Sequence, residues 1–154
     1  MGYPDIRNGS YSLTAERGRI DVAAVHAFLT RCFWARGISK ELVARSIEHS
    51  LCFGVFHLDK QVAFARAVTD YSTYAYLCDV YVLEAHRGNG VGKWMMEFVM
   101  SHPELQGLRR FQLVTRDAHG LYTRFGFKAP DHPERQMEIF RPGLYSGETG
   151  PEGF

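Results

Sequence analysis

The stretch that most constrains the fold covers residues 80–96 and reads as a strand, a glycine-rich turn and the start of a helix. Glycines occupy positions 88, 90 and 92, between an apolar run and an amphipathic run. Because glycine lacks a Cβ, the backbone amides of such a turn can approach a ligand closely. A helix that begins near Gly90 leaves its first amides without internal partners and carries partial positive charge at that end. The stretch therefore predicts an anion site, most naturally for a phosphate or pyrophosphate.

The stretch matches neither of two common phosphate-binding motifs. A Walker loop needs a serine or threonine after its lysine, but Trp94 follows Lys93. The dinucleotide fingerprint starts at Gly88 and then has Lys93 where its third glycine should stand. What remains is an Arg-x-x-Gly-x-Gly turn over residues 87–92, with Arg87 and Lys93 as nearby positive charges. A strand–helix connection without any ligand would explain these six positions equally well, so the flanking segments must decide.

The composition is that of an ordinary soluble domain and excludes several functions. The 154 residues correspond to one domain with a sizeable core. A net charge of +1 without a basic run argues against nucleic acid as a partner. We expect no membrane association, because no apolar run reaches spanning length and the start has no signal pattern. The three cysteines and seven histidines show no metal-ligand or disulfide spacing, so we predict no metal and a cytoplasmic location.

The hydrophobic pattern predicts the order strand, two helices, three strands, helix, strand, helix, strand. Helices are expected at 21–35, 39–49, 90–102 and 117–125, and strands at 11–16, 51–58, 61–69, 74–83, 111–115 and 136–140. Alanines at 63, 65 and 67 share one face of their strand, which would let a helix pack close. Strand 74–83 is almost entirely apolar or aromatic, as in a central strand buried on both faces.

Early hairpins followed by a strand–helix–strand crossover predict a single-domain α/β fold. The sheet should be mixed, mostly antiparallel and twisted, with about six to seven strands and about four flanking helices. We expect an N-terminal arm at 1–9, the folded domain at 10–141 and a loosely ordered tail at 142–154, where glycine and proline are frequent.

A second informative pattern lies in residues 117–127, where a Leu-Tyr pair at 121–122 is followed by Phe-Gly-Phe at 125–127. Together with the loop at 87–92, this pattern resembles the GNAT superfamily of acyl-CoA-dependent N-acetyltransferases. The resemblance covers roughly residues 10–140 and is specific across residues 77–127. It implies a GNAT-like fold with acetyl-CoA as co-substrate. The residues that would hold the pyrophosphate are Arg87, Gly88, Asn89, Gly90, Val91, Gly92 and Lys93.

The resemblance also implies which groups act at the thioester. Tyr122 occupies the motif position of a tyrosine that protonates the departing coenzyme A thiolate, and a phenol that is neutral at pH 7 suits this task. The alternative is a core tyrosine whose hydroxyl bonds a carbonyl. In this family the strand before the loop splays from its neighbour. The backbone amides that would then hold the pantetheine and polarise the thioester carbonyl are those of Val80, Tyr81 and Val82.

The general base and two further cofactor contacts are less defined. Asp79, a carboxylate in an apolar strand, is the candidate base, although a neighbouring donor would equally explain an aspartate there. Glu84 is a weaker candidate, and a water chain is the third. Thr115 stands where many family members have an asparagine that bonds the pantetheine arm. His119 either contacts coenzyme A or caps the short helix.

In this family the acceptor lies across the sheet from coenzyme A. The regions expected there contribute the aromatic residues Phe33, Trp34, Tyr71, Tyr74 and Tyr76. An aromatic wall suits a small amine, whereas ordinary packing explains the same rings, above all Phe33. Asp70 and Asp79 are the only carboxylates expected nearby, which argues against a polycationic acceptor.

We therefore predict transfer of an acetyl group from acetyl-CoA to a primary amine of a small molecule, by direct attack in a ternary complex. A protein lysine or an N-terminal amine could serve as the acceptor instead. The same fold could also form a regulatory module that binds acyl-CoA without turnover, or an interaction domain that needs no coenzyme. Many relatives form homodimers, so a homodimer is a further expectation that no residue of this chain indicates.

Overall fold

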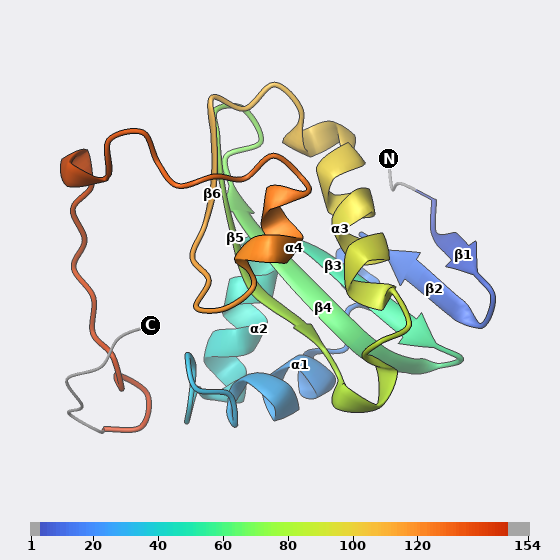
Figure 1. Cartoon of the computed structure of the whole chain (residues 1–154). Coiled ribbons are helices and arrows are strands. Elements are labelled where there is room, and N and C mark those ends of the chain that lie inside the picture. The colour runs from blue at the N-terminus through green and yellow to red at the C-terminus, as the bar shows by residue number, and fades with distance from the viewer. Residues whose placement is uncertain (1–3, 148–154) are drawn as a thin grey trace.

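The structure is a computed structural model that describes residues 4–147. Six strands form one sheet in the order β1-β2-β3-β4-β5-β6 (Figure 1). Their bounds are Ile6–Asn8 (β1), Tyr11–Thr14 (β2), Leu51–His57 (β3), Lys60–Thr69 (β4), Tyr74–Val82 (β5) and Arg110–Leu113 (β6). The first five strands pair antiparallel with their neighbours, and β6 runs parallel to β5. This single α/β domain has the predicted class and strand directions.

Four α-helices accompany the sheet, and each of the first two begins at a capping residue. They are α1 (Val22–Leu29), α2 (Lys40–Glu48), α3 (Val91–Ser101) and α4 (His119–Thr123). Short 3-10 helices cover Arg17–Arg19, Glu84–His86, Pro103–Leu105 and Pro133–Arg135. Asp21 Oδ1 accepts the Ala24 amide at the start of α1, and Ser39 Oγ accepts the Leu42 amide at the start of α2. Each side chain satisfies an amide that the helix itself leaves unpaired.

The sheet separates two apolar clusters, and α3 packs on one of its faces. Ala63, Ala65 and Ala67 of β4 are fully buried in the same cluster as Met95 and Val99 of α3. The prediction of a small face against a helix is thus confirmed, because methyl groups let the helix axis approach the sheet.

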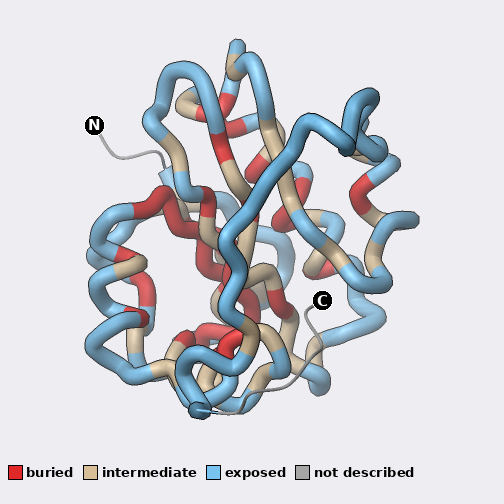
Figure 2. Tube along the Cα trace, turned by 90° about the vertical axis from the view of Figure 1, so that its left-hand side faces the viewer, coloured by how far each residue is buried: buried red, intermediate tan, exposed pale blue. Residues whose placement is uncertain are grey.

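The other face of the sheet is covered by α1 and α2. Phe64 and Tyr81 project there, and the Tyr81 ring stacks on Phe28 with centroids 3.8 Å apart. The same cluster buries Val25 and Leu29 of α1 with Val43 and Ile47 of α2. Figure 2 shows that buried residues gather between the sheet and its helices, while the C-terminal segment runs exposed along the outside.

Three elements differ from the prediction for identifiable reasons. Residues 6–8, expected in a loose arm, pair with β2 as β1. The helix predicted at 21–35 ends at Leu29, and the chain then turns to Gly37, whose φ of +85° favours glycine. Strand β5 is fully buried only at some positions, because Tyr74 and Tyr76 line a cavity and β6 flanks only residues 74–77.

The strand predicted at 136–140 is wrong for the single chain. This segment is extended but pairs with no strand in the described part of the protein, and it runs apart from the sheet (Figure 1). Met137 is 98% exposed and Ile139 is 85% exposed. Alternating residues form a strand only where a partner accepts their hydrogen bonds, and this chain folded alone provides none within residues 4–147. Residues 143–147, at the start of the predicted loose tail, form a turn, while residues 1–3 and 148–154 lie outside the described range.

Candidate active site

Strands β5 and β6 pair over only part of their length and then separate. Their parallel register runs from Tyr74 opposite Arg110 to Leu77 opposite Leu113. Beyond Leu77, β5 continues to Val82 with no strand beside it on that side among residues 4–147. The chain after Leu113 leads instead into α4. This is the splay expected before the glycine loop, and it leaves backbone groups of residues 78–82 available to a ligand.

The glycine loop ends in an uncapped helix N-terminus. Gly88 and Gly90 have φ values of +79° and +76°, and a Cβ added at either would meet nothing within 4 Å. Gly90 is the N-cap of α3 and provides no side chain to bond the first amides. The Trp94 amide makes the first bond into this helix, to the Gly90 carbonyl at 3.0 Å. The amides between them therefore face open space at the positive end of the helix dipole, which suits a diphosphate.

Side chains of the loop hold its shape. Arg87 Nε donates to the Val82 carbonyl at 2.9 Å, which fastens the loop to the end of β5. Asn89 Nδ2 donates to the His86 carbonyl at 3.3 Å. Lys93 is exposed and lies 3.9 Å from a Glu97 carboxylate oxygen, one helical turn further on. Arg87 and Lys93 thus add positive charge beside the open amides without blocking them.

Asp79 lies at a β-bulge in β5. Two steps separate Phe64 and Arg66 on β4, whereas three steps separate Tyr81 and Cys78 opposite them, so β5 carries one extra residue. Asp79 has a φ of +53°, a conformation rare for a residue other than glycine. Such bulges re-aim side chains and interrupt pairing.

The Asp79 carboxylate is already engaged in a network. Its Oδ1 accepts from Trp34 Nε1 at 3.0 Å, and its Oδ2 accepts from Arg66 Nε at 2.9 Å. Arg66 also donates through Nη1 to Ser50 Oγ at 3.1 Å. Burial opposes the charge of Arg66, but the Asp79 carboxylate together with Cys78 and Cys52 raises the pKa of the guanidinium. Sequence reasoning missed Arg66 as the partner, although a lone arginine in an apolar strand was the available signal.

Tyr122 is held in place by the ending of its own helix. Gly126, with a φ of +92°, donates its amide to the Thr123 carbonyl at 3.1 Å. The Phe127 amide donates to the Tyr122 carbonyl at 3.2 Å, and the two rings lie 6.0 Å apart. These bonds form a Schellman ending with its usual apolar contact. The Phe-Gly-Phe pattern is therefore the physical cause of the tyrosine's position.

The Tyr122 side chain is buried but its hydroxyl is not tied down. The residue is 8% exposed, and no hydrogen bond to its hydroxyl occurs within residues 4–147. The alternative of a core tyrosine bonded to a carbonyl is thus not what the structure shows. Burial raises the pKa of Tyr122, so the phenol keeps its proton at neutral pH.

Tyr122 lines a cavity of about 780 Å³ together with two other residues predicted to contact coenzyme A. Thr115 and His119 contribute to the same wall. Thr115 Oγ1 accepts the Ala118 amide at 3.0 Å, which leaves its hydroxyl proton for another acceptor. His119 is exposed at the first position of α4, and no side chain caps that helix, so His119 does not serve as the cap.

The aromatic residues that were predicted to wall the acceptor pocket lie in separate parts of the structure. Tyr74 and Tyr76 line the same cavity as Tyr122, and the Tyr74 hydroxyl donates to Gln112 Oε1 at 2.7 Å. Trp34 belongs to the Asp79 network, while Phe33 lies under the Arg116 guanidinium, 4.0 Å from its ring centre. Two further predicted residues lie at the surface, Tyr71 in the β4–β5 turn and Glu84 in an exposed 3-10 turn before the loop.

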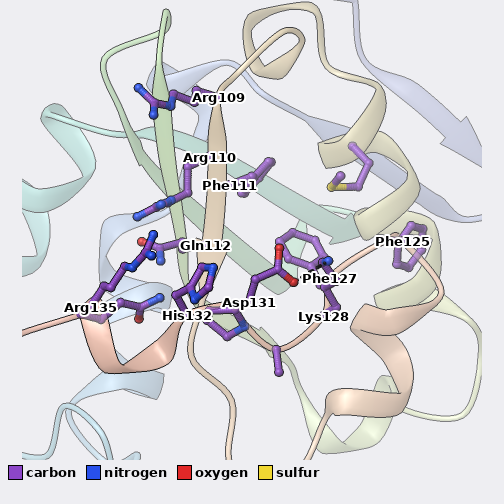
Figure 3. Close-up of a pocket in the computed structure, with 15 residues that line it drawn as sticks. Arg109, Arg110, Phe111, Gln112, Phe125, Phe127, Lys128, Asp131, His132 and Arg135 are labelled. Atoms are coloured by element: carbon purple, nitrogen blue, oxygen red, sulfur yellow. Dashed lines mark hydrogen bonds and ion pairs between the residues drawn. The ribbon is translucent and has the colours of Figure 1, made fainter.

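A second pocket of about 510 Å³ lies beside β6 and is shown in Figure 3. Its walls carry the basic residues Arg109, Arg110, Lys128 and Arg135, with Asp131 among them. It includes none of the predicted cofactor contacts, so we do not place the acetyl donor there.

Metal clusters and membrane-spanning helices are both absent from the described part of the chain. Within residues 4–147, no three or more His, Cys, Asp or Glu side chains are grouped to hold a metal ion. No helix of this range is both long and apolar enough to cross a lipid bilayer.

A family model described as the acetyltransferase (GNAT) family matches residues 22–127. The chain belongs to the GNAT acetyltransferase family. That match includes both the glycine loop and the helix that carries Tyr122.

Individual GNAT relatives agree with this assignment. A crystal structure of a candidate GNAT acetyltransferase from Xanthomonas campestris pv. campestris is 51% identical, with a TM-score of 0.87, and the match covers 88% of this chain and 96% of that one. A candidate acetyltransferase from Gibberella zeae is 29% identical over 74% of this chain and 76% of its own length. A predicted acetyltransferase from Clostridium acetobutylicum, solved with acetyl-CoA, is 16% identical with a TM-score of 0.61, covering 84% of this chain and 94% of that one; it shares the GNAT fold.

Proposed function

We propose that this protein transfers an acetyl group from acetyl-CoA to a primary amine of a small molecule, in one ternary complex. The observation that carries the proposal is the separation of β5 from β6, because β5 leads to the open amides at the α3 N-terminus and β6 leads to α4, which carries the unbonded Tyr122 hydroxyl. The fit favours a diphosphate-bearing donor, because Gly88 and Gly90 leave open the space that any other residue would begin to fill. The family assignment supports the same chemistry.

The residues divide the work between binding and proton transfer. The donor's diphosphate would be held by amides of residues 88–93, with Arg87 and Lys93 supplying charge. Amides of residues 80–82 would hold the pantetheine arm and the thioester oxygen, on which negative charge grows as the amine attacks. As the new C–N bond forms and the C–S bond breaks, the Tyr122 hydroxyl would donate its proton to the sulfur. Its raised pKa keeps that proton available.

The role of Asp79 separates into two hypotheses. As a base it would accept the amine's proton, directly or through water. As a positioning residue it would hold the β5 bulge and so aim the neighbouring amides. The two hydrogen bonds from Trp34 and Arg66 favour positioning, because they fix both carboxylate oxygens to groups of the protein. The variant Asp79→Asn keeps the hydrogen bonds from Trp34 and Arg66 only in part. If Asp79 is the base, this variant should lose the acid limb of the pH–rate profile. If Asp79 is a positioning residue, turnover should fall by the same factor at every pH.

The acceptor is proposed as a small amine with an apolar or aromatic body. Tyr74 and Tyr76 share a wall of the 780 Å³ cavity with Tyr122, so an aromatic surface lies close to the proposed acid. A protein lysine is the second candidate, because the cavity opens beside an exposed segment at residues 136–138.

Two measurements on the intact chain test the proposal. Calorimetric titration with acetyl-CoA should show saturable binding at one site per chain, with ADP competing weakly through its diphosphate. Thiol release should then appear with arylalkylamines and exceed that with polyamines or a lysine peptide. Binding without thiol release for any amine would leave the regulatory module as the function. A titration without binding at millimolar acetyl-CoA would end the proposal.

A further inference from the structure

Three aromatic side chains that the proposed acetyl transfer does not use meet beside the glycine loop. Tyr11 of β2 lies opposite His57 of β3 in the strand register, and their ring centroids are 4.9 Å apart. His86 ends the 3-10 helix before the loop, and its ring centroid lies 5.0 Å from that of His57. The Tyr11 hydroxyl oxygen and His86 Nδ1 are 2.8 Å apart. Two imidazoles and a phenol thus form one cluster, which joins β2 and β3 to the start of the loop.

The hydrogen bond between Tyr11 and His86 is compatible with either charge of the imidazole. A tyrosine hydroxyl can donate to the nitrogen of a neutral imidazole, and it can accept from the N–H of an imidazolium. Tyr11 itself is partly buried against the apolar cluster that contains residues of α3. The His86 carbonyl accepts from Asn89 Nδ2 of the loop at 3.3 Å. His86 is therefore fastened both to β2 and to the loop, whether or not its ring is charged.

The charges around this cluster favour neither imidazolium. Lys60 lies opposite His57 in the β3–β4 register, and Arg87 directly follows His86. The charged residues on the surrounding elements are Arg7, Asp59, Lys60, Glu84, Arg87 and the Lys93–Glu97 pair. No carboxylate among residues 4–147 lies within ion-pair distance of either imidazole. A positive charge on His57 or His86 would therefore lack a close counter-charge from the described protein.

A donor diphosphate at the loop would supply that counter-charge. His86 precedes Gly88 by two residues, so their Cα atoms lie within about 8 Å of each other. Salt screens a charge over a similar distance, about 8 Å at physiological ionic strength. Because the two imidazoles lie side by side, a charge on one opposes a charge on the other, and the pair titrates as a unit.

We propose that the His57–His86 pair takes up a proton when the donor diphosphate binds, and that Tyr11 positions the pair for this coupling. The inference rests on the proposed function, because it needs a diphosphate at the loop, and it adds a proton-dependent control of donor affinity. Coupling between two bound species is reciprocal. Affinity for the donor therefore rises as pH falls through the range in which histidine gains its charge, from about pH 8 to about pH 5.

Calorimetric titration with dephospho-coenzyme A measures the proton uptake directly. Its diphosphate has no group that titrates near neutral pH, whereas the additional phosphate monoester of coenzyme A titrates near pH 6. In buffers of different ionisation enthalpy at about pH 6.5, the parent protein should take up about half a proton per chain on binding. The double variant His57→Gln, His86→Gln should take up almost none. His49→Gln is the matched control, at an exposed histidine that ends α2, and it should keep the parental uptake.

The pH dependence of affinity gives the second readout. Between about pH 8 and about pH 5.5, the Kd of dephospho-coenzyme A should fall about 10-fold for the parent protein and by less than about twofold for the double variant. Circular dichroism should show that both are folded. Binding without proton uptake, or an uptake that persists in the double variant, would overturn this inference and leave the proposed function standing. Absence of binding at every pH would end both.

A measurement on the unaltered chain does not depend on how the double variant folds. Carbon-13 shifts of the imidazole Cε1 atoms, followed through a pH titration, report the protonation of each histidine. Saturating dephospho-coenzyme A should raise the proton affinity of His57 or His86 about 10-fold and leave that of His49 unchanged. An unchanged proton affinity at both His57 and His86, in a protein that binds this probe, would refute the coupling.

Discussion

Two regions of the chain have left-handed backbone conformations, and they differ in whether their polar groups have partners within the protein. At Gly88 and Gly90 the backbone turns with positive φ, no side chain caps the helix, and the surrounding space is open. At Asp79, a few residues earlier, φ is also positive, but both carboxylate oxygens already accept hydrogen bonds from Trp34 and Arg66. The first region presents amides without a partner in the chain, whereas both carboxylate oxygens of the second have partners within the chain.

The difference teaches how to assign a role to an unusual backbone position. Unsatisfied donors at an accessible helix end indicate that an anion binds there. A strained residue whose polar atoms are all satisfied indicates that the strain serves to position its neighbours. Under the proposed function we therefore expect the loop to bind the donor directly and the Asp79 network to act through the bulge that shapes β5.

The largest effect should come from removing the cation of the Asp79 network. Arg66→Met keeps most of the aliphatic packing but leaves Asp79 as an unpaired charge that is 11% exposed. We expect the free energy of unfolding to fall by about 3 kcal/mol, since breaking a buried pair costs more than the pair contributes. Urea denaturation measures this change.

Arg87→Met is the matched control on the loop. Arg87 is exposed and bonds only a carbonyl, so unfolding should change by less than about 0.5 kcal/mol while the affinity for acetyl-CoA falls. Equal stability losses for the two variants would remove the contrast between the regions.

The next largest effect is expected from replacement of the proposed general acid, Tyr122. Tyr122→Phe should lower kcat by about 100-fold and leave the Kd of acetyl-CoA nearly unchanged, because the lost proton donor acts only as the C–S bond breaks. Steady-state thiol release and calorimetry measure the two quantities. The rate should recover in part with a thioester whose thiol has a lower pKa; a variant with parental kcat at saturating amine would refute the acid role.

A side chain at the loop glycine should weaken donor binding more moderately. Gly90→Ala adds a Cβ where φ is +76° and should raise the Kd of acetyl-CoA about 10-fold, through strain and through occupation of the space beside the amides. Gly107→Ala is the control, because Gly107 has a φ of +72° and equally open surroundings away from the loop. Equal changes in Kd for the two variants would mean that strain alone is being measured.

The smallest expected effect is a loss of stability in alkali near the Asp79 network. Burial raises the pKa of Cys78 from 9.0 to about 12, and the unfolded thiol ionises near the lower value. Between these values the unfolded chain binds fewer protons, so stability falls as pH rises from 9 toward 12. Cys78 should contribute a loss of about 1 kcal/mol between about pH 9 and about pH 10. Denaturation at both pH values should show a smaller difference for Cys78→Ala; an unchanged difference would exclude this thiol as a source.

The sequence predicted those local structures of the candidate site that short patterns encode, whereas the roles of its residues stay predictions. The loop at 87–92 and the Tyr122 motif were recognisable because glycines and a Schellman ending are properties of short segments. The Arg66–Asp79 pair was missed because it joins two strands across a bulge, and an extra residue in one strand leaves no mark in the hydrophobic alternation. The strand at 136–140 was predicted from the alternation of apolar and polar residues, but this alternation does not indicate whether a neighbouring strand is present to pair with the segment.

The three buried alanines of β4, at positions 63, 65 and 67, affect the proposed donor site, although they lie in the core and not at that site. Because α3 rests on methyl groups, the height of that helix above the sheet depends on the smallest side chains in the core. The amides at its N-terminus move with the helix as one rigid rod. A larger residue at position 63, 65 or 67 would move α3 away from the sheet and shift its N-terminus relative to β5. If the loop binds the acyl donor as proposed, its affinity for the donor would then change although no group that contacts the donor is altered.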